Sequence, residues 1–381
     1  MKNDQIIPYD LVATKMNHWY NMIKMDWESR ANRMKEEVEK ELQHMEENQD
    51  VLVYYSLLEF RHEMMIAYKT PNAAKGINDR FKQLKQYEGE VNLTGMLEYY
   101  YYFFMGMYYF RQKELTYSLD CYRKAENFLN TVDFENAEIE RAEFYFKLAE
   151  VCYHMKQTYF SMNNALRAYE IFKKQPFYGV MNVRCQFVIF GNLLDSMKTD
   201  EALKQAYKAY KDAKELGNHE RDRNHLIRSA LFNKGLCYNH LEEPDKAFIS
   251  FHKSLQITEP ENNDYFAKTL FVIAFLKGKQ NDTETAWEYY NKSKYLAESN
   301  GNEVVMEKLK MVKGLFLSDD LDLVRETFQF FKKNKSLYPD MESYAISVAE
   351  LLARKKDSWG AIEFYRLANE ARIQIKRGES I

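Results

Sequence analysis

The sequence predicts an all-α protein, and its composition and repeat structure are the basis of that prediction. Only 13 glycines and 6 prolines occur among 381 residues, which is too few for a turn-rich β architecture. Charged residues make up 29% of the chain, as expected for helices joined by short connections. We expect an N-terminal three-helix bundle followed by a tetratricopeptide-like, right-handed superhelix.

Two segments near the N-terminus have apolar residues at helical spacing. In the first segment these residues are Val12, Met16, Trp19 and Ile23. In the second segment they are Trp27, Ala31, Met34, Val38, Leu42 and Met45, and the opposite side of that helix is charged. One stripe of each helix should therefore pack against the protein while the other stripe faces solvent.

The segment MEENQDVLVYYSLLEFR, residues 45–61, joins the second helix to a third across a short polar break. Asn48 or Asp50 can cap the third helix, because a side-chain oxygen there accepts hydrogen bonds from the free N–H groups of the first turn. Gln49 would then lie at the tip of a helix hairpin. Residues 51–69 are more apolar than one buried face requires, so this helix is either buried on all sides or presents a docking surface.

Pro71 should end the third helix, because proline removes a backbone donor and disfavours helix at the preceding residue. Three glycines, Gly76, Gly89 and Gly95, bound the segment after it. The expected division is a docking bundle at 1–70, a linker at 71–95 with one short helix around residues 81–87, and a peptide-binding repeat domain at 96–381.

From residue 96 onward, small and aromatic residues recur in a fixed pattern. Each unit begins with a small residue, at Gly106, Ala149, Gly191, Gly235, Ala274 and Ala349. In most units a second small residue follows after twelve positions, at Ser118, Ser161, Ala247, Ala286 and Ala361, and four positions later stand Tyr122, Ala165, Phe251, Tyr290 and Tyr365. This spacing resembles the tetratricopeptide pattern, in which small residues let two antiparallel helices approach. The unit at Gly191 is one residue shorter, and a degenerate unit lies around Gly314.

Charge and motif content argue against several functions. A net charge of −3 gives no basic footprint for nucleic acid. No stretch has the apolar length of a membrane helix or a signal peptide, so we expect a cytoplasmic protein. The cysteines, Cys121, Cys152, Cys185 and Cys237, form no CxxC pair and should be reduced and buried. The histidines form no HExxH motif, and we expect no metal site.

The first helices of stacked repeats line a concave groove that can hold an extended peptide. Polar residues expected in this lining are Glu150, Tyr153, Asn192, Asp195, Asn233 and Tyr238. Amides and carboxylates on successive helices suit pairing with a peptide backbone and a basic side chain. The alternative for each residue is a hydrogen bond between helices inside the protein.

Several long segments resemble the Rap family of Gram-positive bacteria. They are MEENQD, YYSLLEFRHEMM, LTGMLEYYYYFFMGMY, VCYHMKQTYFSMNNALRA and CQFVIFGNLLDS. The resemblance implies a cytoplasmic quorum-sensing regulator whose N-terminal bundle binds a response regulator or transcription factor. It also implies that the repeat domain binds a short secreted Phr peptide, which inhibits the protein.

The resemblance further implies that the protein promotes hydrolysis of the response regulator's phospho-aspartate. The implied roles are catalysis for Gln49, target docking for Phe60 and Leu97 together with the neighbouring Asp50, and peptide anchoring for Asp195 and Asn233. We expect no cofactor in this chain, because the response regulator supplies its own Mg²⁺. The alternative function is stoichiometric sequestration of a transcription factor or mobile-element regulator without catalysis.

Overall fold

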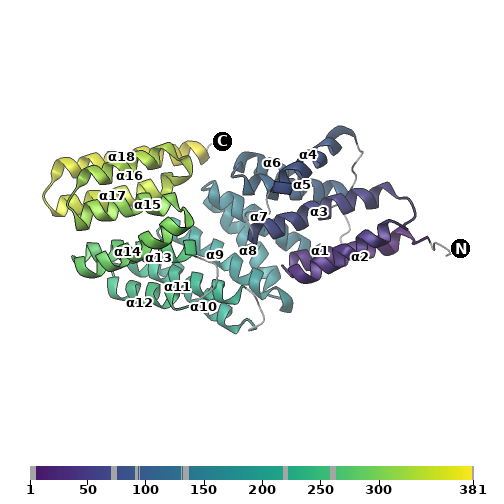
Figure 1. Ribbon diagram of the computed structural model, residues 1–381, viewed down its shortest axis with the longest axis horizontal. Coiled ribbons are helices and arrows are strands. Elements are labelled where there is room, and N and C mark those ends of the chain that lie inside the picture. Colours follow the sequence, from purple (N-terminus) through teal and green to yellow (C-terminus); the bar gives the residue numbers. More distant parts are fainter. Residues whose placement is uncertain are drawn as a thin grey trace. The chain divides into compact units, whose positions relative to one another are not determined.

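The computed structural model is built from α-helices joined by short turns, which confirms the predicted class (Figure 1). The structure describes residues 6–69, 75–90, 93, 95–129, 131, 137–217, 222–257 and 263–379. Within this part of the chain there is no β-strand, and an isolated parallel bridge joins Ile7 to Met45.

The helices form two compact units, which we describe separately. The first unit comprises Met1–Val151 and Glu170–Lys174, and the second comprises Cys152–Tyr169 and Gln175–Ile381. The division falls inside α7 (Ala137–His154) and α8 (Thr158–Phe172), so each of these helices contributes residues to both units.

The first unit begins with the helices that the apolar spacing predicts. Its helices before α7 are α1 (Tyr9–Lys24), α2 (Glu28–Leu42), α3 (Gln49–Lys69), α4 (Lys75–Glu90), α5 (Met96–Arg111) and α6 (Leu115–Leu129). The four residues predicted for the apolar stripe of α1 are all buried. In α2 only Ala31 and Val38 are buried, whereas Trp27, which precedes the helix, is 41% exposed.

Between α3 and α5, the structure has more helix than the sequence suggested. The expected short helix at 81–87 is part of α4, which runs from Lys75 to Glu90. The predicted stop at Pro71 lies outside the described residues. The division into functional regions at 1–70, 71–95 and 96–381 follows boundaries other than those of the two compact units, and it stays a prediction.

Aromatic side chains of α5 form the centre of the first unit. Tyr99, Phe103 and Phe104 of this helix are fully buried or nearly so. The Tyr20 ring of α1 packs edge-on against Tyr100, with ring centroids 5.1 Å apart. Packing of this kind adds to the hydrophobic stabilisation of α1 and α5. The Tyr54 ring of α3 stacks on Tyr100, and the Phe81 ring of α4 stacks on Tyr108, so α1, α3 and α4 are each held against α5 by aromatic contacts.

The second unit consists of helix pairs and short helical turns. After α8 come α9 (Gly179–Asp195), α10 (Thr199–Glu215), α11 (Arg223–His240), α12 (Pro244–Leu255), α13 (Asn263–Lys279), α14 (Thr283–Asn300), α15 (Glu303–Val312), α16 (Leu321–Lys333), α17 (Tyr338–Arg354) and α18 (Ser358–Glu379). Consecutive helices such as α13 and α14, or α17 and α18, pack closely against each other. This arrangement agrees with the predicted tandem repeats.

The contacts at Gly106 and Gly235 show why the repeat needs small residues. A Cβ atom on Gly106 would lie 2.5 Å from the ring of Tyr122, and one on Gly235 would lie 2.5 Å from the ring of Phe251. The Ser118 hydroxyl also donates to the Gly106 carbonyl at 2.8 Å. Glycine therefore allows the aromatic ring sixteen positions later to fill the space between paired helices, as predicted.

The turns between paired helices share one backbone feature that the sequence did not reveal. A residue with positive φ occupies this turn at Lys113, Lys156, Met197, Glu242, Asn281, Asp319 and Lys356. Asp26, between α1 and α2, has the same conformation, with φ of 58°. Non-glycine residues seldom adopt this conformation, so its recurrence marks a common hairpin geometry. The α1–α2 hairpin therefore turns in the same way as the repeats.

The degenerate repeat around Gly314 contains a five-residue π-helix, Lys313–Leu317, directly after α15. A Cβ atom on Gly314 would collide with the backbone carbonyl of Asp320. The Asp320 N–H donates to the Gly314 carbonyl at 2.8 Å. The chain thus turns tightly here, where the later positions of the pattern fail to match.

Candidate functional site

The first residue of α3 is Gln49, and its side chain is exposed. Asn48 caps the helix, because its Oδ1 accepts a hydrogen bond from the Val51 N–H at 3.1 Å. This confirms one of the two predicted caps. Asp50 is also exposed in the first turn. The amide of Gln49 therefore projects from a helix start whose position is set by its neighbour.

The residues before α3 are held by the N-terminal segment. The Ile7 N–H donates to the His44 carbonyl at 2.9 Å, and the Glu46 N–H donates to the Ile7 carbonyl at 2.9 Å. These two hydrogen bonds form the isolated bridge between Ile7 and Met45. The sequence gives no sign of this support, since a bridge of one residue leaves no periodic signal. It restrains the connection that leads to Gln49.

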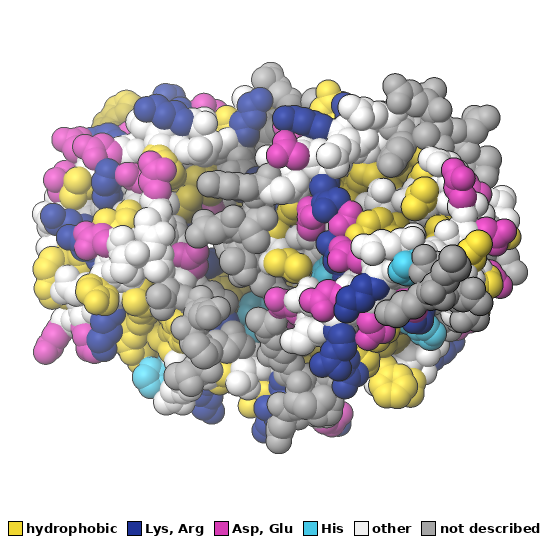
Figure 2. Space-filling model, turned by 45° about the vertical axis from the view of Figure 1, so that its right-hand side comes forward, with side chains coloured by type: hydrophobic (Ala, Val, Ile, Leu, Met, Phe, Trp, Pro, Cys, Tyr) yellow, Lys and Arg dark blue, Asp and Glu magenta, His cyan; other side chains and the backbone are white. Residues whose placement is uncertain are grey.

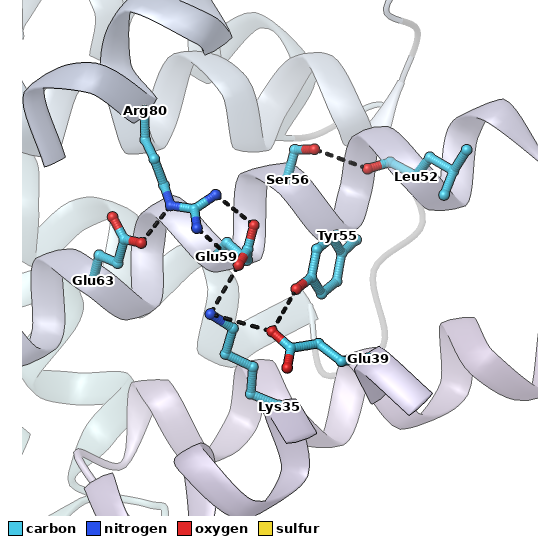
Figure 3. A network of polar contacts seen from close by, with 8 residues as sticks. All are labelled: Lys35, Glu39, Leu52, Tyr55, Ser56, Glu59, Glu63 and Arg80. Atoms are coloured by element: carbon cyan, nitrogen blue, oxygen red, sulfur yellow. Dashed lines mark hydrogen bonds and ion pairs between the residues drawn. The ribbon is translucent and has the colours of Figure 1, made fainter. Parts of the chain in front are cut away.

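A network of buried and half-buried charges fixes α3 against α2 and α4 (Figure 3). Glu59, on α3, accepts from Lys35 at 2.8 Å and from two nitrogens of Arg80 at 2.5 and 3.0 Å. The Arg80 Nε also donates to Glu63. The Tyr55 hydroxyl donates to Glu39 of α2 at 2.9 Å, and burial with this hydrogen bond raises the pKa of Tyr55. Three helices are therefore joined beyond the first turn of α3.

The structure does not bring Phe60 and Leu97 to the surface near Gln49. Phe60 is fully buried, with its ring centroid 5.8 Å from that of Tyr108, and Leu97 is 7% exposed. The surface of α3 that remains includes Leu52, which is 40% exposed. Of the two expectations for this helix, burial on most sides describes the structure. A contact between Phe60 and another protein would require the helices around it to separate.

In the second unit, Asp195 is the last residue of α9 and lies beside Tyr153 and Lys156. The Lys156 ammonium donates to Asp195 Oδ2 at 2.7 Å. A Cβ atom on Gly191 would lie 2.8 Å from the ring of Tyr153, so the glycine makes room for that ring one turn before Asp195. Burial, together with the nearby negative charge of Asp195, raises the pKa of Tyr153. The structure thus brings together Tyr153 and Asp195, two of the six predicted groove residues.

Asn192 is buried and forms its hydrogen bonds inside the protein, which is the alternative stated above for the predicted groove residues. It is 1% exposed, and its amide donates to the Ser161 hydroxyl at 2.8 Å and to the Val188 carbonyl at 2.9 Å. Glu150 belongs to the first unit, where it pairs with Lys147 at 2.7 Å. Asn233 is half-buried in α11.

Tyr238 belongs to a second polar cluster, which includes two residues that sequence reasoning missed. Its hydroxyl lies 2.7 Å from the hydroxyl of Tyr207. The Lys234 ammonium lies 3.8 Å from the centroid of the Tyr207 ring, a cation–π contact. The hydrogen bond to Tyr238 and the nearby ammonium lower the pKa of Tyr207, while burial lowers the pKa of Lys234. A phenol and an amine of altered acidity therefore lie together on α10 and α11.

The described residues also bear on what the sequence predicts for metal sites, membrane-spanning helices and cysteines. In the described part of the chain, no three His, Cys, Asp or Glu side chains are grouped so as to hold a metal ion. The helices described include none with the length and apolar character needed to cross a bilayer. The cysteines are free thiols, and all but the half-buried Cys121 are buried. Figure 2 shows basic and acidic side chains intermixed on one face.

Comparison with known proteins identifies the family. Residues 6–67 match the family model for the N-terminal part of response regulator aspartate phosphatase H. The chain is 43% identical over 376 residues to response regulator aspartate phosphatase I of Bacillus subtilis strain 168, covering 98% of this chain and 94% of that protein. It is 32% identical to the regulatory protein RapF of the same strain, covering 99% and 98% of the two chains.

A solved structure agrees with these matches. The crystal structure of a Rap protein complexed with competence and sporulation factor superposes with a TM-score of 0.83 and 34% identity, covering 97% of this chain and all of that chain. A relative that is 43% identical over 98% of this chain, together with a shared fold over nearly the full length, shows the family. The chain belongs to the Rap family of response regulator aspartate phosphatases and related regulators.

Proposed function

We propose that this protein binds a response regulator through its N-terminal helices, promotes hydrolysis of the regulator's phospho-aspartate, and is inhibited by a short signalling peptide. The observation that supports catalysis most directly is the exposed amide of Gln49 at a helix start held by Asn48 and Ile7. A relative at 43% identity carries the name of this activity.

Hydrolysis of a phospho-aspartate needs only a small catalytic contribution from this protein. An acyl phosphate is already activated, and the response regulator would supply the Mg²⁺ that neutralises the phosphoryl oxygens. The Gln49 amide oxygen would accept a hydrogen bond from the attacking water, while its NH₂ group would donate to a phosphoryl oxygen. Glutamine suits both tasks, whereas the negative charge of a glutamate would repel the phosphate.

The docking surface would include the exposed first turn of α3. Asp50 and Leu52 are exposed there beside Gln49. Phe60 and Leu97 could contribute only after the helices that bury them separate, so in the present arrangement they support the fold of the first unit. We therefore propose that docking by region 1–70 relies mainly on the connection and helix start around Gln49.

The second unit would bind the peptide. Asp195 offers an exposed carboxylate, and Asn233 offers an amide on the next helix pair. A carboxylate pairs well with a basic side chain, and an amide pairs with a peptide backbone. The relative solved with competence and sporulation factor supports a peptide ligand. The free thiols suit a reducing compartment, and we assign the protein to the cytoplasm.

The test is a phosphate-release assay on a panel of phosphorylated response regulators, with this protein at a small fraction of the regulator concentration. Catalysis predicts complete loss of phosphate with many turnovers per molecule. The second candidate function is stoichiometric sequestration, which is favoured by similarity to a relative named only as a regulatory protein. It predicts one-to-one binding without acceleration of phosphate loss.

A further inference from the structure

A cavity of about 490 Å³ lies in the first unit and is lined by side chains of α4, α5 and α6. Its volume falls in the range of pockets that bind small organic molecules. None of the residues assigned above to catalysis, target docking or peptide binding lines it. The function proposed for this protein therefore leaves the cavity without a role.

One wall of the cavity is an aromatic face of α5. Tyr101, Tyr102, Met105 and Tyr109 recur at helical spacing along this wall. The ring of Tyr109 lies 5.4 Å from the ring of Tyr117 on α6, measured between centroids. Tyr102 and Tyr109 are half-buried, and Tyr117 is 60% exposed. Rings that are only partly buried can still stack against a flat group of a ligand.

Three basic side chains and one acidic side chain complete the lining. Lys85 comes from α4, whereas Asp120, Arg123 and Lys124 come from α6. Asp120 lies 3.8 Å from Arg123, and both side chains are more than half exposed, so this ion pair holds Arg123 only weakly. Among the residues that the structure describes, no carboxylate forms an ion pair with Lys85. The cavity is thus locally positive in a chain whose net charge is −3.

The two lysines lie close to aromatic rings at this wall. Lys124 Nζ is 4.9 Å from the centroid of the Tyr102 ring. Lys85 Nζ is 5.8 Å from the centroid of the Phe81 ring, which in turn lies 5.5 Å from the ring of Tyr109. These contacts hold both ammonium groups beside the aromatic wall, where they can pair with the anionic group of a ligand that stacks on it.

We propose that this cavity binds a small planar organic anion, whose ring stacks on the tyrosines and whose anionic group pairs with Lys85 and Lys124. A neutral ring would gain no charge pairing, and an anion without a ring would gain no stacking. A cationic ligand would be repelled. The site shares no residue with the helix start at Gln49 or with the residues proposed for peptide binding, so the inference stands independently of the proposed function.

The test measures binding of four probes to the full-length protein by calorimetry. Naphthyl phosphate, naphthoate and naphthalenemethanol share one aromatic ring system, and the first two are anions whereas the third is neutral. Cyclohexanecarboxylate is an anion without an aromatic ring. One variant combines Lys85→Glu with Lys124→Glu and reverses two charges, and a second variant, Tyr117→Ala, removes one ring. All three side chains are exposed, so both variants should fold.

Each variant has a matched control. Lys82→Glu reverses the charge of another exposed lysine on α4 that does not line the cavity. Phe160→Ala removes a ring that is 58% exposed and precedes the small residue of the following repeat, Ser161, as Tyr117 precedes Ser118. A general effect of surface charge or of exposed rings would appear in these controls as well.

Both aromatic anions should bind the wild type about tenfold more tightly than naphthalenemethanol or cyclohexanecarboxylate does. The double charge reversal should weaken both aromatic anions about tenfold and leave naphthalenemethanol unchanged. Tyr117→Ala should weaken all three naphthalene probes about three- to tenfold, as expected for loss of an aromatic contact. Both controls should behave as the wild type. The tighter of the two anions shows whether the site prefers a phosphate or a carboxylate.

The thiol of Cys121 reports independently where the probe binds. Cys121 lines the cavity and is half-buried, whereas Cys152, Cys185 and Cys237 are buried. Saturating naphthyl phosphate should slow alkylation of Cys121 by N-ethylmaleimide about threefold or more, because the reaction depends on access to the thiol. Mass spectrometry of the peptide that contains Cys121 measures this rate.

Two results would overturn the proposal. If the wild type binds neither aromatic anion, or binds the neutral and anionic probes equally, the cavity does not select a planar anion. If an aromatic anion binds but neither the double charge reversal weakens it nor Cys121 is protected, the probe occupies another part of the protein.

Discussion

The ammonium of Lys24 lies 2.6 Å from Glu140 Oε1, and both side chains are almost completely buried, at 2% and 1% exposure. Lys24 is in the last turn of α1 and Glu140 is in the first turn of α7. Each charge is therefore also favoured by the dipole of its own helix. The pair connects the beginning of the chain with a helix more than a hundred residues later, within the first unit.

Breaking this pair should destabilise the first unit strongly. Lys24→Met leaves the Glu140 carboxylate buried without its partner, which typically costs about 3–5 kcal/mol. Replacing both residues, Lys24→Met with Glu140→Leu, should recover much of that loss because no uncompensated charge remains. Urea denaturation of the two single variants and the double variant measures this coupling. Additive losses would show that the two side chains stabilise the protein independently.

Glu143, one turn further along α7, should make stability depend on pH. Burial raises the pKa of Glu143 from 4.5 to about 7, against the lowering effect of Lys24. Because the folded pKa is raised, the protonated form stabilises the protein fully below about pH 4.5, and this contribution is lost as pH rises through about 7. The loss should be on the order of 3 kcal/mol, because each unit of pKa shift corresponds to about 1.4 kcal/mol. In Glu143→Gln the loss should disappear from denaturation curves measured across this range.

His62 should make stability depend on pH in the opposite direction, with stability falling as the pH falls. It is buried edge-on against Trp19, and burial lowers the pKa of His62 from 6.5 to about 4. Its neutral form stabilises the protein fully above about pH 6.5, and this contribution is lost as pH falls through about 4. Replacement His62→Leu should remove this loss on the acidic side. A pH dependence in His62→Leu equal to that of the wild type would contradict this assignment.

Gly235→Ala tests the close helix approach of the repeats. The new methyl group would lie 2.5 Å from the ring of Phe251, which is fully buried, so we expect a loss of about 2–3 kcal/mol. Gly301→Ala is the control. A Cβ atom on Gly301 would have no neighbour within 4 Å, but Gly301 has φ of 65°. The alanine should therefore cost only the strain of the left-handed backbone conformation, about 1 kcal/mol. Equal losses in the two variants would mean that the ring does not restrict this approach.

Phe60→Ala should mainly lower the stability of the protein. Because the ring is fully buried, its removal should cost about 3–5 kcal/mol of the free energy of unfolding. Thermal and urea denaturation measure this directly. A variant that keeps its stability and loses only affinity for a response regulator would show that Phe60 serves docking in the way the sequence first suggested.

The first helix of the chain was predictable because burial of one side of a helix requires apolar residues to recur at helical spacing. Val12, Met16, Trp19 and Ile23 were found from spacing alone, and all are buried. The small and aromatic positions of the repeat were predictable for the same reason, as the contact of Gly235 with Phe251 shows.

The candidate sites were predictable only in part. Gln49 and its cap follow from a polar break before an apolar run, and the structure places both as expected. The aromatic ring that packs against Gly191 belongs to Tyr153 of the preceding helix pair, and not to a residue of the same repeat. Lys156, the ion-pair partner of Asp195, is likewise 39 positions away from it. Such contacts depend on how neighbouring pairs stack, and local spacing does not record that.

Gln49→Ala separates catalysis from binding. Gln49 is exposed and Asn48 provides the cap, so stability should change little, whereas Asn48→Ala should cost about 1 kcal/mol. Affinity for the response regulator should also be retained in Gln49→Ala, since one exposed amide contributes little to an interface. Calorimetric titration with the regulator checks affinity, and a large loss would make Gln49 a docking residue.

The most direct test of the central claim compares phosphate release from a phosphorylated response regulator by the wild type and by Gln49→Ala, each at a small fraction of the regulator concentration. We predict that the wild type turns over many times and that the variant is slower by about a hundredfold or more, the usual effect of losing a group that positions a reacting water. Equal turnover by the two proteins would contradict the role assigned to Gln49.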